Sequence, residues 1–213
     1  VRYIEHLQKY EVDYGEVNLS GAGEGSVEIM TIHKSKGLEF PIVILAGMGK
    51  QFNMQDLNAR LLIHPDYGLG ADAILPDRRM IVSTLYKQVI RRKLLEETLG
   101  EEIRVLYVAL TRAKEKLIMT GTIGNLEKRL LSLYRFRENE QELLPAETRL
   151  NGKTYWDYVL PALARHRCMA PLFHEYGIFM NTANPLYKDP AEFKVTRVTA
   201  RELTESEVME QAE

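Results

Sequence analysis

Residues 101–121 change from the hydrophobic pattern of a helix to that of a strand. The apolar positions of the first part recur at spacings of three and four and so share one helical face: Ile103, Leu106, Tyr107 and Leu110. The apolar run 117–119 follows and ends at Gly121, as in a short strand. We therefore predict an amphipathic helix that leads directly into a strand, with Tyr107 in the core.

A second segment, residues 27–45, predicts a strand, a polar connection and another strand. Val27, Ile29 and Thr31 alternate with their neighbours, and residues 42–46 form a continuous apolar run, as in a strand covered on both faces. The connection is dense in polar and turn-forming residues: Thr31, His33, Lys34, Ser35, Lys36, Gly37 and Glu39. Gly37 permits a backbone turn that a side chain would hinder. Because ligands of open α/β sheets bind at strand ends, this loop is a candidate site.

Arg112 lies near the C-terminal end of the predicted helix. Its guanidinium is planar, permanently charged and carries forked donors, which suits it to phosphate. A basic last turn with Arg112, Lys114 and Lys116 also complements the helix dipole without any ligand. This segment alone leaves both interpretations open.

The two segments together resemble motifs of a known family. TIHKSKGLEFPIVIL (31–45) resembles motif V, and EEIRVLYVALTRAKEKLIM (101–119) resembles motif VI, of superfamily 1 DNA helicases of the UvrD, PcrA and Rep type. GMGKQFNMQDLN (47–58), the long insertion before motif VI, and NGKTYWDYVLPALARH (151–166) are closer to the AddA (RexA) group of helicase-nuclease subunits. The fold that this resemblance implies is α/β: a truncated RecA-like (P-loop NTPase-type) second motor domain with a parallel sheet and a mainly helical C-terminal extension.

The resemblance implies a role for each matching residue. Arg112 corresponds to the arginine finger that reaches the γ-phosphate of ATP, while Gly37 and Glu39 lie close to the nucleotide. Thr31 and His33 correspond to contacts with the backbone of single-stranded DNA, and Lys36 could serve either ligand. No residue is expected to bind a metal ion directly.

Each role has a structural alternative. The imidazole of His33 could be satisfied by a backbone carbonyl at a strand end. Glu39 could simply pair with Lys36 on the surface, and Lys34 could be a solvated charge.

The chain lacks the motifs of a complete ATP site. No GxxxxGK[ST] occurs, and Gly47 to Lys50 is followed by Gln51, so that segment is interpreted as the turn leaving a strand. The acidic magnesium-binding strand of a first motor domain is also missing. We therefore expect ATP and Mg²⁺ in the intact enzyme only, with no ligand bound to this chain alone and no activity from it.

Chain organisation and composition fit part of a larger protein. We expect the exit of an inserted helical subdomain at 1–25, the RecA-like core at 26–122, and at 123–213 an extension leading toward a nuclease domain outside the chain. The single cysteine, Cys168, excludes an internal disulfide, and no apolar run suggests a membrane span. A net charge of −2 gives no global sign of nucleic-acid binding, so DNA contact requires a local basic surface.

The remaining segments give coarser predictions. Residues 52–80 suggest an irregular insertion or hairpin, and 83–99 a helix with a basic cluster (Arg91, Arg92, Lys93) that either is solvated or contacts DNA or a partner. Gly100 is expected to separate that helix from the motif VI helix. Helices are predicted at 125–134 and 154–166, with Trp156 as a packing anchor, and strands are expected within 171–193.

The function that the resemblance implies is that of a 3′ to 5′ ATP-dependent DNA helicase and exonuclease subunit in bacterial double-strand break repair and recombination. Its partners would be single-stranded DNA and an AddB/RexB-type subunit, in the bacterial cytoplasm and without a membrane. Two alternatives stay open: a stand-alone UvrD-like repair helicase, and a non-catalytic helicase-fold module that binds DNA or a partner.

Overall fold

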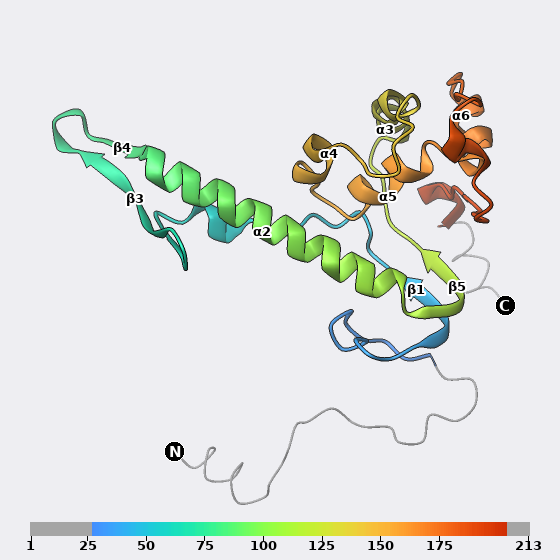
Figure 1. Ribbon diagram of the computed structural model, residues 1–213, viewed down its shortest axis with the longest axis horizontal. Helices are drawn as coiled ribbons and strands as arrows, with labels where there is room; N and C mark the ends of the chain where they lie inside the picture. Colours follow the sequence, from blue (N-terminus) through green and yellow to red (C-terminus); the bar gives the residue numbers. More distant parts are fainter. Residues whose placement is uncertain (1–26, 204–213) are drawn as a thin grey trace, which may run out of the picture.

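The computed structural model describes residues 27–203. The predicted exit of a helical subdomain at 1–25 and the last part of the predicted extension, residues 204–213, lie outside the described residues. A long helix has a two-stranded parallel sheet at its C-terminal end and a separate antiparallel sheet at its N-terminal end (Figure 1). A group of short helices follows the parallel sheet in the sequence.

The parallel sheet pairs β1 (Phe40–Leu45) with β5 (Ala113–Met119), and the helix α2 (Leu85–Leu110) precedes β5 directly. The register pairs Val43 with Leu117 and Leu45 with Met119. One face of the sheet packs on Leu106 and Ala109 of α2 through Leu45, Leu117 and Met119. Ile42 and Ile44 on the other face are exposed, so the prediction of a strand covered on both faces is wrong for the part of the chain that the structure describes. The predicted helix-to-strand transition and the α/β class with a parallel sheet are confirmed.

The strand predicted at 27–31 is wrong. Residues 27–30 have no regular secondary structure, and Val27 and Ile29 are exposed. Within residues 27–203, no strand pairs with this segment, and a strand without a hydrogen-bonded neighbour is not stable.

Helix α2 is longer and more exposed than the pattern predicts. It runs continuously through Gly100, so the expected break there is wrong. A glycine inside a helix costs only about 1 kcal/mol relative to alanine, and the buried neighbours Leu99 and Leu106 hold the helix on both sides. Tyr107 is 68% exposed, so its predicted core position is also wrong. The buried stripe is narrower and centres on Leu106 and Ala109.

The insertion at 52–80 forms most of a three-stranded antiparallel sheet, which confirms the hairpin prediction. Its strands are β2 (Leu61–His64), β3 (Gly68–Leu75) and β4 (Met80–Ser83), in the order β2-β3-β4. Short 3₁₀ helices lie at Gln55–Asn58 and Pro76–Arg78.

One face of this antiparallel sheet packs on the first half of α2. Leu62 and His64 are buried there, and Lys87 of α2 forms a 2.7 Å ion pair with Asp72 of β3. A side chain at Gly70 would meet the Cα of Lys87 at 2.8 Å, so only glycine allows this close approach.

The basic cluster on α2 is used within the chain. Arg91 donates to the Leu57 carbonyl oxygen and to Asn58, Arg92 pairs with Glu96, and Lys93 pairs with Glu97. These bonds favour the solvated-surface interpretation of the cluster over a DNA contact.

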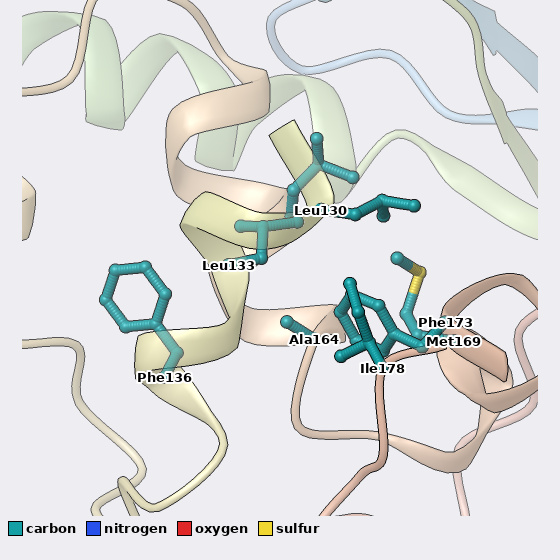
Figure 2. Packing of buried hydrophobic residues seen from close by; sticks show 8 residues of the cluster. Leu130, Leu133, Phe136, Ala164, Met169, Phe173 and Ile178 are labelled. Carbon is teal, nitrogen blue, oxygen red and sulfur yellow. The ribbon is translucent and has the colours of Figure 1, made fainter. Parts of the chain in front are cut away.

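Short helices make up the C-terminal part: α3 (Leu126–Leu133), α4 (Ala146–Leu150), α5 (Trp156–Leu163) and α6 (Ala170–Glu175). Further 3₁₀ helices lie at Tyr134–Phe136, Arg167–Met169 and Pro185–Lys188. Figure 2 shows their shared core, in which Leu130 and Leu133 of α3 face Met169, Phe173 and Ile178. The helices at 125–134 and 154–166 are confirmed, whereas the strands expected within 171–193 are wrong.

Trp156 connects this core to the core beneath the parallel sheet. Its side chain packs against both clusters, which confirms its predicted role as a packing anchor. The backbone N–H of Trp156 also donates to the Met48 carbonyl oxygen at 3.1 Å. The C-terminal helices are therefore joined to the end of β1 by packing and by hydrogen bonding.

Candidate functional site

The polar loop before β1 is a compact turn over residues 32–37. The Thr31 carbonyl oxygen accepts from the backbone N–H groups of Lys34 and Ser35 at 3.1 and 3.2 Å. Ser35 is buried, and its hydroxyl donates to the Ile32 carbonyl oxygen at 2.7 Å. This serine holds the loop together, a role that the sequence argument did not assign. Serine hydroxyls often bond to a backbone carbonyl a few residues away, so a serine within this polar turn was the signal in the sequence that could have indicated the role of Ser35.

Gly37 ends this turn in the left-handed region, with φ of +84°. An L-residue with a side chain is strained at that angle, although nothing lies within 4 Å of the position that its β-carbon would occupy. The predicted turn at Gly37 is thus present, and it directs the chain through Leu38 and Glu39 into β1.

Arg112 follows the end of α2, and three acceptors orient its guanidinium. Nε donates to the Val108 carbonyl oxygen at 2.9 Å, Nη1 to the Leu38 carbonyl oxygen at 2.9 Å, and Nη2 to Thr111 Oγ1 at 3.1 Å. The Thr111 hydroxyl in turn donates back to the last turn of α2. The guanidinium is therefore held by both segments that the sequence analysis singled out.

The backbones of the two segments are also paired next to Arg112. The Phe40 N–H donates to the Arg112 carbonyl oxygen at 2.9 Å. Glu39 directly precedes Phe40, and its carboxylate pairs with Lys114 at 3.4 Å, not with Lys36. Both members of this ion pair are more than half exposed, so it contributes little to stability, about 0 to 1 kcal/mol.

Thr31, His33 and Lys36 are exposed on the loop. Within residues 27–203 the side chains of His33 and Lys36 have no hydrogen-bond or ion-pair partner, so the alternative of a carbonyl-satisfied His33 is not observed. The structure brings Leu38, Glu39 and Arg112 together. Thr31, His33 and Lys36 lie on the adjoining turn, and no contact joins them to Arg112.

The exits of β1 and β5 approach each other closely at two glycines. A side chain on Gly121 would meet Trp156 Nε1 at 2.7 Å and the Gly49 nitrogen at 2.9 Å. The Lys50 N–H donates to the Gly47 carbonyl oxygen at 2.9 Å, which confirms the interpretation of 47–50 as the turn leaving a strand. The close approach of Gly121 to Gly49 therefore lies at the C-terminal end of β1 and β5, opposite to the end that carries Arg112.

The described residues do not form a metal site or an enclosed nucleotide site. Within residues 27–203, no group of three or more His, Cys, Asp or Glu side chains could hold a metal ion. A cavity of about 370 Å³ lies among α3, α4 and α5 and does not include Arg112. The Arg112 guanidinium is half-buried, and Nε, Nη1 and Nη2 each donate to an acceptor of the chain itself.

The parallel sheet and the helix that leads into β5 are those of an α/β domain of the RecA-like type. Residues 7–123 match the UvrD-like helicase C-terminal domain, and the chain belongs to that family. More particularly, the chain is similar to proteins named as the A-type subunit of an ATP-dependent helicase/nuclease. It is 41% identical over 210 residues to that of Clostridium botulinum (strain Loch Maree / Type A3) and 41% identical over 195 residues to that of Clostridium kluyveri (strain NBRC 12016).

These alignments cover most of this chain but little of the relatives. They include 99% and 92% of the chain, respectively, and 16% of each relative, so the chain spans about one sixth of their length. The match continues through α3 to α6, beyond the helicase family match. Among residues 27–203, no helix has the length and apolarity needed to cross a membrane.

Proposed function

We propose that this chain forms the second motor domain of a longer ATP-dependent 3′ to 5′ DNA helicase-nuclease subunit, which we call the complete motor. The observation that carries the proposal is the Arg112 guanidinium, held at the junction of motifs V and VI by Leu38, Val108 and Thr111. The similarity to helicase/nuclease proteins over 99% of the chain supports the helicase-nuclease type over a stand-alone repair helicase.

In this proposal, Arg112 stabilises negative charge on the γ-phosphate of ATP bound between two motor domains. An arginine in this role is worth about 10³ to 10⁵ in rate. ATP with Mg²⁺ supplies the transferable phosphoryl group, and the ligands of the metal lie outside residues 27–203. Glu39 accepts hydrogen bonds from the nucleotide, and Gly37 lets the backbone approach it. To reach a phosphate, Arg112 exchanges one of its backbone acceptors for a phosphate oxygen, which forms a stronger, charge-assisted bond.

Thr31, His33 and Lys36 contact the backbone of single-stranded DNA from the loop before β1. Hydroxyl, imidazole and ammonium donors position phosphates without reading sequence. The loop ends at Leu38, whose carbonyl oxygen accepts directly from Arg112. A shift of the loop on DNA therefore moves an acceptor of the arginine, which would link DNA binding to ATP hydrolysis.

We also propose that the complete motor works with a partner subunit of the AddB/RexB type in the bacterial cytoplasm, in double-strand break repair and recombination. The word "subunit" in the names of the relatives supports the existence of a partner. The absence of a spanning helix among residues 27–203 is compatible with that location.

The test replaces Arg112 in the complete motor and measures DNA-stimulated ATP hydrolysis. Arg112→Ala is expected to lower kcat by about 10³ or more, and Arg112→Lys by nearly as much, because lysine lacks the forked donors. Arg92→Ala is the matched control, since Arg92 is an exposed arginine of α2 that lies outside motif VI and pairs with Glu96. It should leave hydrolysis unchanged.

Unchanged hydrolysis in Arg112→Ala would contradict the arginine-finger role and favour the non-catalytic module. DNA binding tests the loop separately. Lys36→Ala should weaken single-stranded DNA binding for all sequences alike and lower its salt dependence by about one counterion.

A further inference from the structure

Ser35 is a buried polar residue in a loop that otherwise faces solvent. Among residues 31–39, all of which the structure describes, Ser35 alone is buried, with 7% of its surface exposed. Burying a hydroxyl costs free energy unless the group is hydrogen-bonded. The Ser35 hydroxyl meets this condition by donating to the Ile32 carbonyl oxygen at 2.7 Å. Its side chain therefore serves the conformation of the loop and not its contact with water.

The hydroxyl bond is better formed than the backbone bonds that Ser35 makes in the same turn. Its length of 2.7 Å is typical of an O–H donor. The Ser35 N–H donates to the carbonyl oxygens of Thr31 and Ile32 at 3.2 Å each, which is at the long end of the range for an N–H donor. Gly37, which ends the turn, permits a wide range of backbone angles and does not stiffen the turn by itself. The shape of the turn therefore depends strongly on the Ser35 side chain.

A chain of hydrogen bonds joins Ser35 to the guanidinium of Arg112. At one end, the Ile32 side chain packs against the core beneath the parallel sheet, and its carbonyl oxygen accepts from the Ser35 hydroxyl. The Ser35 carbonyl oxygen accepts from the Leu38 N–H at 3.0 Å. The Leu38 carbonyl oxygen in turn accepts from Arg112 Nη1 at 2.9 Å. Because β1 begins only at Phe40, the position of Leu38 depends on this turn more than on the sheet.

We propose that Ser35 is a positioning residue for ATP hydrolysis, because its hydroxyl holds the Leu38 carbonyl oxygen where Arg112 binds it. This role rests on the proposed function, in which Arg112 acts on the γ-phosphate. Ser35 itself does not touch the nucleotide and acts only through the orientation of the guanidinium. An arginine binds phosphate through a fixed fork of donors, so a loosely held guanidinium stabilises the transferred phosphoryl group less well.

The test measures ATP hydrolysis by the complete motor at saturating single-stranded DNA. Ser35→Ala is expected to lower kcat about fivefold, the fold-change of one net hydrogen bond between uncharged groups. KM for ATP should stay unchanged, because the arginine acts in the transition state. Ser132→Ala is the matched control, since the Ser132 hydroxyl also donates to a carbonyl oxygen three residues earlier, that of Arg129 at 2.6 Å, but lies in α3. It should leave both constants unchanged.

Saturating DNA separates this role from a role in DNA binding alone. If Ser35 only shapes the loop for DNA, Ser35→Ala needs more DNA but reaches the wild-type kcat, and that result overturns the proposal. A raised KM for ATP at wild-type kcat also overturns it, because that pattern belongs to a residue that binds ATP equally in the ground state and the transition state.

A double variant tests whether Ser35 acts through Arg112. Arg112→Ala leaves a slow residual hydrolysis, which is measured in single turnover with the motor in excess over ATP. Adding Ser35→Ala should change this residual rate less than about twofold, because the group that Ser35 positions is already absent. A further loss of about fivefold would show that the serine supports the fold in general or acts by another route, and it would overturn the proposal.

These outcomes are separable from the test of the proposed function. Unchanged hydrolysis in Arg112→Ala contradicts the arginine-finger role itself, and the positioning role fails with it. A large loss in Arg112→Ala together with wild-type kcat in Ser35→Ala leaves the arginine-finger role standing and refutes the positioning role alone.

Discussion

Arg112 Nη1 donates to the carbonyl oxygen of Leu38 at 2.9 Å, across 74 positions of sequence. The acceptor is a backbone atom, so the strength of this hydrogen bond does not depend on the side chain at position 38. The position of the acceptor, however, depends on the turn that ends at Gly37. The arginine that the proposal assigns to ATP is therefore positioned by the loop assigned to DNA.

Thr111 provides a side-chain test of this arrangement. Its hydroxyl accepts from Arg112 Nη2 and donates to the end of α2. Thr111→Val keeps the shape but removes that bond, which is worth about 1.5 kcal/mol with a charged donor. We expect kcat of the complete motor to fall about tenfold with KM for ATP unchanged.

Thr111→Ser retains the hydroxyl and should restore kcat. Thr98→Val is the matched control, because Thr98 also bonds a carbonyl of α2 but lies far along the helix from Arg112. If both valine variants lower kcat equally, the effect belongs to the helix and not to the orientation of the arginine.

Gly121 provides a test of the strand exits. An alanine methyl there would lie within 3 Å of Trp156 Nε1 and of the Gly49 backbone nitrogen. Since backbone cannot move aside cheaply, Gly121→Ala should lower the free energy of unfolding by about 1 to 3 kcal/mol. Gly124→Ala meets nothing within 4 Å and serves as the control. Urea unfolding of both variants decides the matter, and equal midpoints would contradict the close contact.

The sequence predicted the parts of the fold that depend on local periodicity and on the two motifs. The step from helix to strand at Arg112, the turn at Gly37 and the anchor at Trp156 all follow from residue type and spacing. The exposure of Tyr107 could not be predicted in this way. The spacing of apolar residues shows which of them share a face of the helix, but not how much of that face the sheet and the neighbouring residues cover. The strand expected at 27–31 failed for a related reason, since a strand needs a neighbour that local sequence does not reveal.

For the candidate site, the sequence indicated Arg112, Gly37 and Glu39 but not what holds them. Two acceptors of Arg112 are the backbone carbonyl oxygens of Leu38 and Val108, which carry no signal in residue type. The alternative that Glu39 pairs with Lys36 is not observed, because Lys36 is near only in sequence, whereas the pairing of β1 with β5 brings Lys114 to Glu39. The roles of these residues toward ATP and DNA stay predictions.

Two glycines with open surroundings should respond oppositely to alanine. Gly37 has φ of +84°, so Gly37→Ala should destabilise the chain by about 1 kcal/mol. Gly100 is helical and has nothing within 4 Å of its β position, so Gly100→Ala should stabilise by about 0.5 to 1 kcal/mol. Thermal unfolding of the two variants checks the signs. A stabilising Gly37→Ala would mean that the turn does not need the left-handed conformation.

Asp157 makes the stability of the C-terminal part depend on pH. Its Oδ2 accepts from the backbone N–H groups of Lys153 and Thr154 at 2.8 and 2.9 Å, and its Oδ1 pairs with Arg129 at 2.7 Å. Burial acts to raise the pKa of Asp157, but the hydrogen bonds from Lys153, Arg129 and Thr154 together outweigh it and lower the pKa below its ordinary value of 3.8. The carboxylate therefore stabilises the fold above the pKa of the unfolded chain, and this contribution is lost as pH falls through the lower pKa of the folded state.

Asp157→Asn should consequently destabilise the chain by about 1 to 3 kcal/mol at pH 7, because the amide bears no charge for Arg129 and the N–H donors. The difference between wild type and variant should shrink below about pH 4, where the wild-type carboxylate begins to lose its advantage. Asp77→Asn, at an exposed turn, is the control and should show no such dependence. Urea unfolding at pH 7 and near pH 3 measures both differences. An Asp157→Asn effect of equal size at the two pH values would place its origin in packing rather than in the ionised carboxylate.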